Sequence, residues 1–139
     1  MSYVITGASR GIGLELVKQL LASSETSKVF ALSRGSPPSA LQALLDKHSD
    51  RVVHITCAVD DDKSVQQAAK DVEAGLNGSG LDILINNAGV MGTVFDGPES
   101  LPSAELSSVL ETNVVGVHRM VVAFLPLLEK GSQKKVISM

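Results

Sequence analysis

Thr6-Gly7-Ala8-Ser9-Arg10-Gly11-Ile12-Gly13 is the stretch that decides the fold of this chain. It follows an apolar run at residues 3–5 and opens a helix-like run at residues 14–21. A glycine-rich turn between a strand and a helix lets the backbone approach a phosphate, while the new helix directs unpaired N–H groups and its positive dipole end at the anion. The turn therefore predicts a site for a dinucleotide diphosphate, formed by Gly7, Ser9, Arg10, Gly11, Ile12 and Gly13.

Short apolar, β-branched runs alternate with helical periodicities along the chain. We expect strands at residues 2–6, 28–32, 51–58, 81–85 and 134–139. We expect helices with apolar stripes at 12–21, 41–45, 65–76 and 106–128. Continuously apolar strands that alternate with helices predict a parallel sheet covered on both faces. The predicted fold is α/β, a Rossmann-type doubly wound parallel sheet of order 3-2-1-4-5, with its ligand crevice at the carboxyl ends of strands 1 and 4.

Length, composition and charge limit the classes of protein that fit. The 139 residues, of which 44% are hydrophobic, suit a single nucleotide-binding domain at 1–139 with its own core. The formal net charge of -3, with scattered lysines and arginines, predicts no nucleic-acid partner. We predict no metal site. The lack of charged clusters favours a neutral, apolar small molecule as substrate.

Targeting signals are not evident in the sequence. The first strand pattern starts at residue 2, which leaves no room for a signal peptide. The apolar stretch 114–128 is interrupted by His118, Arg119 and Pro126, and we expect it to be too short to cross a bilayer. Cys57 lies in an apolar strand pattern, as a buried, reduced thiol would. These features predict a cytoplasmic protein with no membrane partner.

The end of the second strand distinguishes between the two nicotinamide coenzymes. The residue roughly 20 positions after the last glycine of such a turn lies beside the adenosine ribose. Here Ser33 is followed by Arg34, where a carboxylate would repel a 2′-phosphate. Arg10 adds a second positive charge, so we predict NADP(H) in preference to NAD(H). The alternative, that Arg10 and Arg34 are ordinary solvated charges, stays open at this point.

Three motifs, in order, resemble the N-terminal half of a short-chain dehydrogenase/reductase, and in particular the NADPH-dependent carbonyl reductases. They are the glycine turn at 6–13, the tetrapeptide at 86–89, and Asn113 within Glu111-Thr-Asn-Val-Val-Gly116. The resemblance implies that a second turn shapes the site under the adenosine ribose, through Asn86, Asn87, Ala88 and Gly89. It also implies that Asn113 corresponds to the asparagine of the catalytic tetrad.

Asn113 also has a structural interpretation that needs no resemblance. It lies on the apolar stripe of the expected helix at 106–128, so we predict a buried amide that is hydrogen-bonded to backbone or water. A bridge between helix and sheet fits this position as well as a proton relay does.

The sequence departs from the family pattern in two places. The family often has an aspartate near the adenine at the end of the third strand, where this chain has Ala58. We interpret Asp60, Asp61 and Asp62 as the N-cap and first turn of the next helix. The resemblance also predicts a catalytic serine and a Tyr-x-x-x-Lys motif beyond the fifth strand, and the sequence ends at Met139 before them.

Three functional classes stay open from the sequence. The first is the truncated coenzyme-binding part of a ketone or aldehyde reductase, inactive in this form. The second is a non-catalytic binding module, and the third a catalyst of hydride-independent chemistry such as isomerisation. In each case we expect a homodimer or a complex through the fifth strand or the fourth helix, because an unpaired sheet edge and an uncovered apolar stripe favour association. The loop at 90–103 is a candidate lid or substrate wall.

Overall fold

The computed structural model describes residues 1–93 and 97–139. In this part of the chain the strands form one parallel sheet of order β3-β2-β1-β4-β5, which confirms the predicted order. The strands are β1 (Ser2–Thr6), β2 (Lys28–Ser33), β3 (Val52–Thr56), β4 (Ile83–Asn86) and β5 (Lys135–Ser138). The α-helices are α1 (Gly11–Ala22), α2 (Ser39–Lys47), α3 (Asp62–Leu76), α4 (Ser103–Leu110) and α5 (Gly116–Lys130). A 3-10 turn, Pro98–Ser100, precedes α4.

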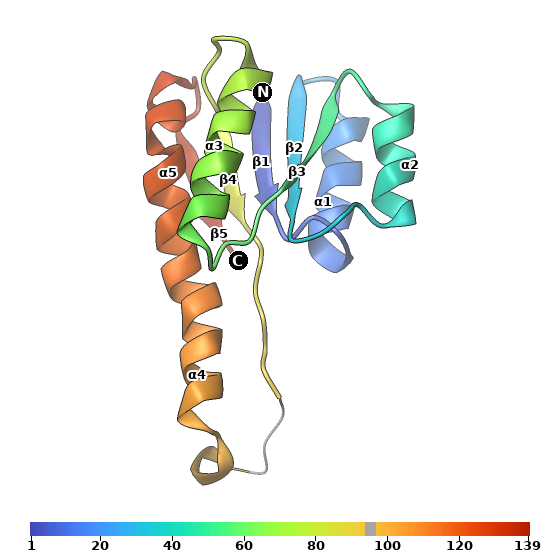
Figure 1. Ribbon diagram of the computed structural model, residues 1–139. Helices are drawn as coiled ribbons and strands as arrows, with labels where there is room; N and C mark the ends of the chain where they lie inside the picture. Colours follow the sequence, from blue (N-terminus) through green and yellow to red (C-terminus); the bar gives the residue numbers. More distant parts are fainter. Residues whose placement is uncertain (94–96) are drawn as a thin grey trace.

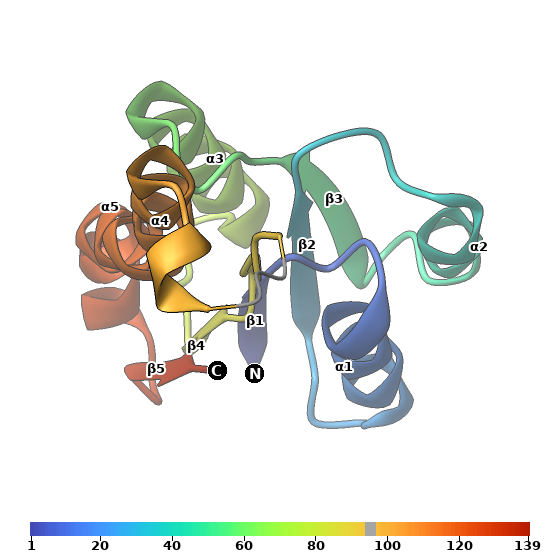
Figure 2. The ribbon, with the colours of Figure 1, turned by 90° about the horizontal axis from the view of Figure 1, so that it is seen from below.

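Helices cover both faces of the sheet. Figure 2 shows α1 and α2 on one face and α3, α4 and α5 on the other side. Successive residues of a strand point to opposite faces, so neighbours in β1 serve different cores. Val4 packs with Phe30 and Phe124 under α3 and α5, whereas Ile5 packs with Val17 under α1. This division into two cores is what the continuous apolar strands predicted.

The predicted fourth helix is interrupted. Between α4 and α5 the chain makes a π-helical turn, Glu111–Val115, and the three parts form one rod that extends beyond the sheet (Figure 1). A π turn carries one more residue per hydrogen-bonded ring than an α turn, and therefore shifts the faces of the helix that follows. Gly116, directly after the turn, packs against the segment between β3 and α3. A Cβ at this position would lie 3.0 Å from both the side chain and the carbonyl of Val59.

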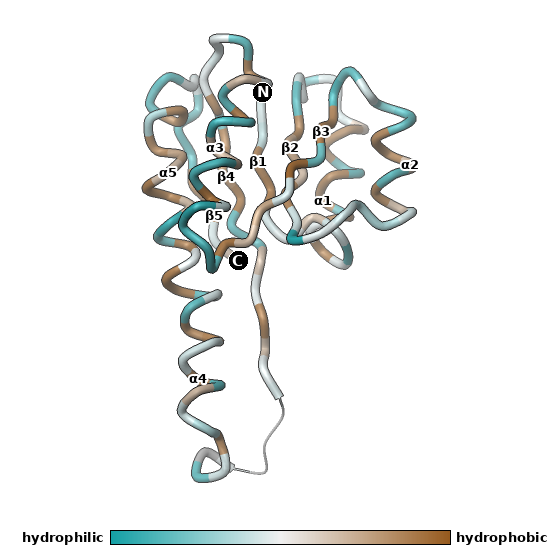
Figure 3. The backbone as a smooth tube through the Cα atoms, in the orientation of Figure 1, coloured by the Kyte–Doolittle hydropathy of each residue, from teal (hydrophilic) through white to brown (hydrophobic). Residues whose placement is uncertain are grey.

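The length of this rod corrects one expectation. Residues Ser103–Lys130 are, by length and composition, long and apolar enough to cross a membrane, so the argument from the short stretch 114–128 is wrong. The hydrophobic positions along the rod appear brown in Figure 3. The half of the rod formed by α5 packs on α3 and β4 and buries Met120, Phe124 and Leu127 in the protein core.

Asp82 ties the amino end of the sheet together. Its carboxylate accepts hydrogen bonds from the Ser2 N–H at 2.8 Å and from the Ser132 hydroxyl at 2.7 Å. Burial raises the pKa of Asp82, but the hydrogen bonds from Ser132, Ser2 and the Gln133 N–H outweigh it and lower the pKa to about 2. One side chain thereby joins the start of β1 to the loop that leads into β5.

Candidate functional site

The glycine turn after β1 has the backbone that its sequence requires. Gly7 and Gly11 have φ angles of 67° and 55°, in the left-handed region that favours glycine. Gly13 is required for a different reason, because a Cβ there would collide with the Gly7 carbonyl and come within 2.6 Å of the Asn87 amide nitrogen. The start of α1 therefore lies directly against the ends of β1 and β4, with its first N–H groups facing the turn.

Thr6 and Asn87 lock the carboxyl ends of β1 and β4 together. The Thr6 hydroxyl oxygen accepts from the N–H groups of Asn87 and Ala88 at 3.0 and 2.9 Å. The Asn87 amide donates to the carbonyls of Thr6 and Gly7 at 2.9 and 3.2 Å. These hydrogen bonds fix the glycine turn against the end of β4. They do not involve the backbone N–H groups at the start of α1.

A cavity of about 420 Å³ opens over these strand ends. It is lined by every residue predicted to bind the coenzyme except Asn86: Gly7, Ser9, Arg10, Gly11, Ile12, Gly13, Ser33, Arg34, Asn87, Ala88 and Gly89. The structure adds residues that the sequence did not single out as binding residues: Cys57, Val59, Asp60, Val90 and Thr112. The volume falls within the range of sites for small molecules and cofactors.

Asn86 lies outside this cavity, contrary to the expectation that it shapes the same turn. Strand alternation points it away from Asn87, into a space beside Gly116 and Met120 that is too small for a water molecule. Its side chain is 3% exposed, and neither amide atom has a hydrogen-bond partner among the described residues. The role that the resemblance implies for Asn86 is therefore not supported by its side-chain position.

The cavity wall around β2 carries the predicted positive charge. Arg10 and Arg34 are both exposed and both line the cavity. Within residues 1–93 and 97–139 neither guanidinium takes part in an ion pair. Ser33 is 6% exposed, and its hydroxyl contacts the Gly35 carbonyl at 3.2 Å and the Nε2 atom of His54 at 2.9 Å. The two arginines therefore give this part of the cavity a positive potential that favours an anion. The Ser33 hydroxyl lies in the same wall and is held by His54 of β3.

Cys57 forms part of the cavity floor. It is 3% exposed, as predicted for a buried thiol. Burial, and to a smaller extent the charge of Asp60, raises the pKa of Cys57 to about 11. The sulfur therefore stays protonated near pH 7 and contributes apolar surface to the cavity.

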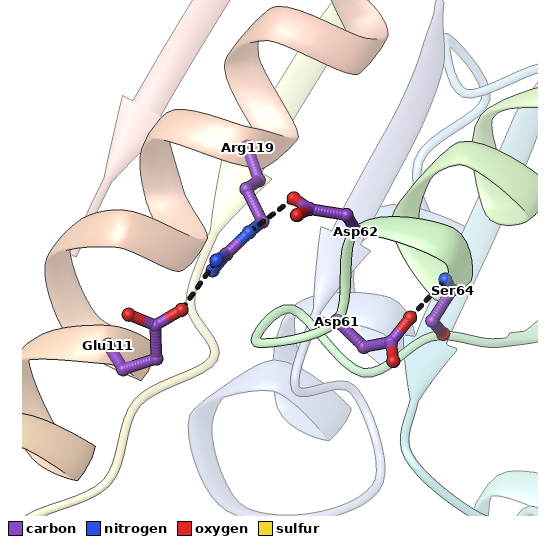
Figure 4. Close-up of polar contacts among 5 residues, drawn as sticks. All are labelled: Asp61, Asp62, Ser64, Glu111 and Arg119. Carbon is purple, nitrogen blue, oxygen red and sulfur yellow. Dashed lines mark hydrogen bonds and ion pairs between the residues drawn. The ribbon is translucent and has the colours of Figure 1, made fainter.

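The three consecutive aspartates around the start of α3, Asp60, Asp61 and Asp62, have different roles. Asp61 caps the helix by accepting from the Ser64 N–H at 2.6 Å, as expected, and Asp62 opens the first turn. Arg119 of α5 then bridges Asp62 and Glu111, at 2.5 Å to each (Figure 4). Asp60 precedes the N-cap residue Asp61 and lines the cavity, so its assignment to the N-cap and first turn is wrong.

Asn113 is exposed, which contradicts the prediction of a buried amide. It lies in the π turn, and its side chain pairs with the backbone of Val90 in both directions. The Nδ2 atom donates to the Val90 carbonyl at 2.8 Å, and the Oδ1 atom accepts from the Val90 N–H at 2.9 Å. These contacts match the bridging interpretation, because they fasten the helical rod to the segment that leaves β4.

The segment after β4, the candidate lid, is described in part. Val90 lines the cavity, and the Thr93 N–H donates to the Glu105 carboxylate of α4. Residues 94–96 of the same loop lie outside the described residues. The described part therefore forms one wall of the cavity and is attached to both α4 and the π turn.

Comparisons with known proteins agree with this geometry. The family model for short chain dehydrogenases matches residues 2–139. A short-chain dehydrogenase/reductase from Aspergillus aculeatus, AacuF, is 39% identical over 144 residues, covering 99% of this chain and 53% of the relative. A short-chain dehydrogenase from Penicillium roqueforti, anuI, is 36% identical and covers 90% of this chain and 48% of the relative. The chain spans about half the length of the curated relatives that it matches.

Solved structures give the same result. The crystal structure of NADPH-bound carbonyl reductase from chicken fatty liver is similar with a TM-score of 0.86 and 38% identity, covering 93% of this chain and 52% of that one. The carbonyl reductase Sniffer of D. melanogaster has a TM-score of 0.84 at 32% identity, covering 93% of this chain and 52% of that one.

Proposed function

Because the chain belongs to the short-chain dehydrogenase family, we propose that it is the NADP(H)-binding half of a reductase of ketones or aldehydes. The observation that carries this proposal is the cavity at the ends of β1 and β4, which is lined by two exposed arginines, Arg10 and Arg34, that we expect to contact a 2′-phosphate. The resemblance to an NADPH-bound carbonyl reductase supports the same coenzyme. Bound NADPH supplies a hydride to the carbonyl carbon of a substrate.

The residues of the cavity fit the coenzyme in three places. The N-terminus of α1, with Gly11, Ile12 and Gly13, offers N–H groups and a positive dipole end to the diphosphate. Arg10 and Arg34 provide charge-assisted contacts for the 2′-phosphate. The backbone of Asn87, Ala88 and Gly89 lines the cavity and would form the wall for the adenosine ribose.

Titration of purified protein with both reduced coenzymes tests the choice of NADPH. Arg34→Asp should weaken NADPH by about 2 kcal/mol, the scale of one charge-assisted contact, and spare NADH. Lys70→Asp is the control, because it makes the same charge change on an exposed position of α3 outside the cavity lining. An equal loss for both coenzymes in Arg34→Asp, or no binding of either coenzyme to the parent protein, contradicts the proposal.

We propose that turnover belongs to a longer chain that adds a serine and a Tyr-x-x-x-Lys motif. Reduction of a carbonyl needs an acid that protonates the forming alkoxide and a group that holds the carbonyl oxygen. Residues 1–139 should bind NADPH without oxidising it in the presence of ketones and aldehydes. An in-frame extension that carries both motifs should give reductase activity. Turnover without NADPH would favour the hydride-independent alternative instead.

We further propose that the chain self-associates through the rod or through β5. Leu106, Leu110 and Val114 are 44%, 47% and 57% exposed, and they recur every four residues along one helical stripe. Both hydrophobic residues of β5, Val136 and Ile137, are also exposed. Uncovered apolar stripes of this kind favour a second protein surface over water.

A cytoplasmic location is part of the same proposal. A protonated, buried Cys57 fits a reducing compartment, where free thiols persist. Cell fractionation of the whole protein with a C-terminal tag tests it. Recovery in the membrane or secreted fraction would contradict the proposed location.

A further inference from the structure

We propose that His54 is a positioning residue for coenzyme choice. It orients the Ser33 hydroxyl so that this hydroxyl donates to a 2′-phosphate and thereby helps the cavity to distinguish NADPH from NADH. The inference rests on the proposed NADP(H) binding and adds a residue that does not itself line the cavity.

Sheet register brings the two side chains together. β2 and β3 pair in parallel, with Ala31 opposite His54 and Ser33 opposite Thr56. Residues two apart in a strand point to the same face, so His54 lies diagonally from Ser33 on one face of the sheet. The imidazole spans this diagonal, and its Nε2 atom lies 2.9 Å from the Ser33 hydroxyl oxygen.

The tautomer of His54 determines where the Ser33 hydroxyl proton points. A hydroxyl has one proton to donate, and its oxygen can accept from other groups. If Nε2 carries the imidazole proton, it donates to Ser33, and the hydroxyl proton turns to the Gly35 carbonyl at 3.2 Å. If Nε2 is bare, it takes the hydroxyl proton itself. Only the first arrangement leaves Ser33 a proton for an incoming anion.

A bound 2′-phosphate would replace the Gly35 carbonyl as the acceptor of the Ser33 hydroxyl proton. The contact between the Ser33 hydroxyl and the Gly35 carbonyl is long for an O–H donor, whereas hydrogen bonds to ionised oxygens are shorter and roughly twice as strong. With the imidazole proton on Nε2, as the proposal requires, the hydroxyl proton moves from the Gly35 carbonyl to the phosphate while the Nε2–H of His54 keeps donating to the Ser33 oxygen. The 2′-hydroxyl of NADH carries no charge and gains much less from the same rearrangement.

His54 acts through direction and not through charge. Burial lowers the pKa of His54, and the Gly35 carbonyl opposes this effect to a smaller extent. The imidazole is therefore neutral near pH 7. An amide N–H that reaches the position of Nε2 should replace it, whereas an apolar side chain should not.

Coenzyme titrations of four variants test the inference. His54→Leu should bind NADPH about fivefold to tenfold more weakly, the scale of one hydrogen bond, and bind NADH as the parent protein does. His54→Gln, whose amide reaches toward the Nε2 position, should restore NADPH binding to within about twofold of the parent protein. In a Ser33→Ala background, His54→Leu should cause no further loss. If His54→Leu does not fold, His54→Asn, with a shorter amide, takes its place.

Three results would overturn the inference. These are an equal loss of NADPH and NADH in His54→Leu, a failure of His54→Gln to restore binding, and a loss in His54→Leu that persists without the Ser33 hydroxyl. The failure of the proposed function looks different, because then the parent protein binds neither coenzyme or does not prefer NADPH. In that case the inference falls with it.

Discussion

Asn86 and Asn87 are neighbours in the sequence, but their amides lie in opposite environments. The Asn87 amide donates to two backbone carbonyls, whereas both polar atoms of the Asn86 amide are buried without a partner in the described part of the chain. A buried polar group that makes no hydrogen bond costs about 1–3 kcal/mol. The pair therefore offers a matched test of what each amide contributes to stability.

Asn86→Leu should raise the free energy of unfolding by about 1 kcal/mol, because it replaces an unsatisfied amide with an apolar side chain of similar length. Asn87→Leu should lower it by about 1–3 kcal/mol, because it removes both donors that hold the glycine turn. Urea denaturation of the two variants measures the difference. A stability loss of similar size in both would show that the Asn86 amide is satisfied in solution.

Two glycines of the turn should respond differently to the same added methyl group. Gly13→Ala should destabilise the fold by about 2 kcal/mol or more, because its Cβ would collide with backbone and with Asn87. Gly11→Ala should cost about 1 kcal/mol, since its φ of 55° is strained for alanine but no atom lies within 4 Å of the new Cβ. Thermal unfolding of the two variants ranks these costs, and a larger loss in Gly11→Ala would contradict this account of close packing.

Sequence motifs predict those cavity residues that lie together in one short segment of the chain. The glycine turn was predicted because its spacing and its neighbouring strand identify it locally, and residues 87–89 were predicted because they resemble a motif of a known family. Cys57, Asp60 and Thr112 were not predicted as cavity residues, since they reach it from distant segments that only the crossovers bring together. The Ser33–His54 contact was missed for the same reason, because it depends on the register of two strands.

At the scale of elements, Asp82 makes the stability of the sheet depend on pH. The folded-state pKa of about 2 lies below the ordinary value of 3.8, so the stabilisation is present above about pH 4 and is lost as the pH falls toward 2. The side chain is partly exposed, so solvent screening reduces the effect to about 1 kcal/mol. This contribution comes from one side chain that connects β1, β4 and the loop before β5.

Asp82→Asn should lower the free energy of unfolding by about 1 kcal/mol at pH 7. The difference from the parent protein should shrink as the pH falls from 4 toward 2, because the Asp82 carboxylate becomes protonated over this range and is about half protonated at pH 2. Denaturation curves at a series of pH values measure this convergence. A difference that stays constant between pH 7 and pH 2 would mean that the Asp82 charge has no part in it.

The helical rod shows which feature of a helix apolar periodicity does not predict. Apolar spacing predicted one helix over 106–128, and helical structure continues through this range. The π turn was not predicted, because one extra residue in a turn leaves the local composition unchanged. It becomes visible only through its contacts, where Asn113 reaches Val90 and Gly116 packs on Val59.

At the scale of the whole molecule, the proposed self-association predicts a result in sedimentation. Leu110→Lys should shift the protein toward monomer, because a charge at the centre of the exposed stripe costs more in an interface than in water. Ala40→Lys is the control, since it adds the same charge to an exposed position of α2, on the opposite side of the sheet. A parent protein that sediments as a monomer at high concentration would refute the association.

The order of the strands follows from the alternation of apolar runs and helices, and the sequence predicted it correctly. The uncovered apolar stripe expected on the fourth helix is present at Leu106, Leu110 and Val114, but periodicity did not show that Met120 and Phe124, farther along the same rod, are fully buried. A periodic stripe predicts that a helix has an apolar face. It does not predict whether the sheet reaches far enough to cover that face.

The central place of β1 also affects how this chain is made. One neighbour, β2, follows soon, but the Asp82 carboxylate that binds the Ser2 N–H is 80 positions away, just before β4. At roughly 5–20 residues per second of synthesis, this interval lasts roughly 4–16 s. During these seconds of synthesis the edge of β1 that later pairs with β4 has no partner strand, and apolar residues of the growing chain stay exposed to solvent.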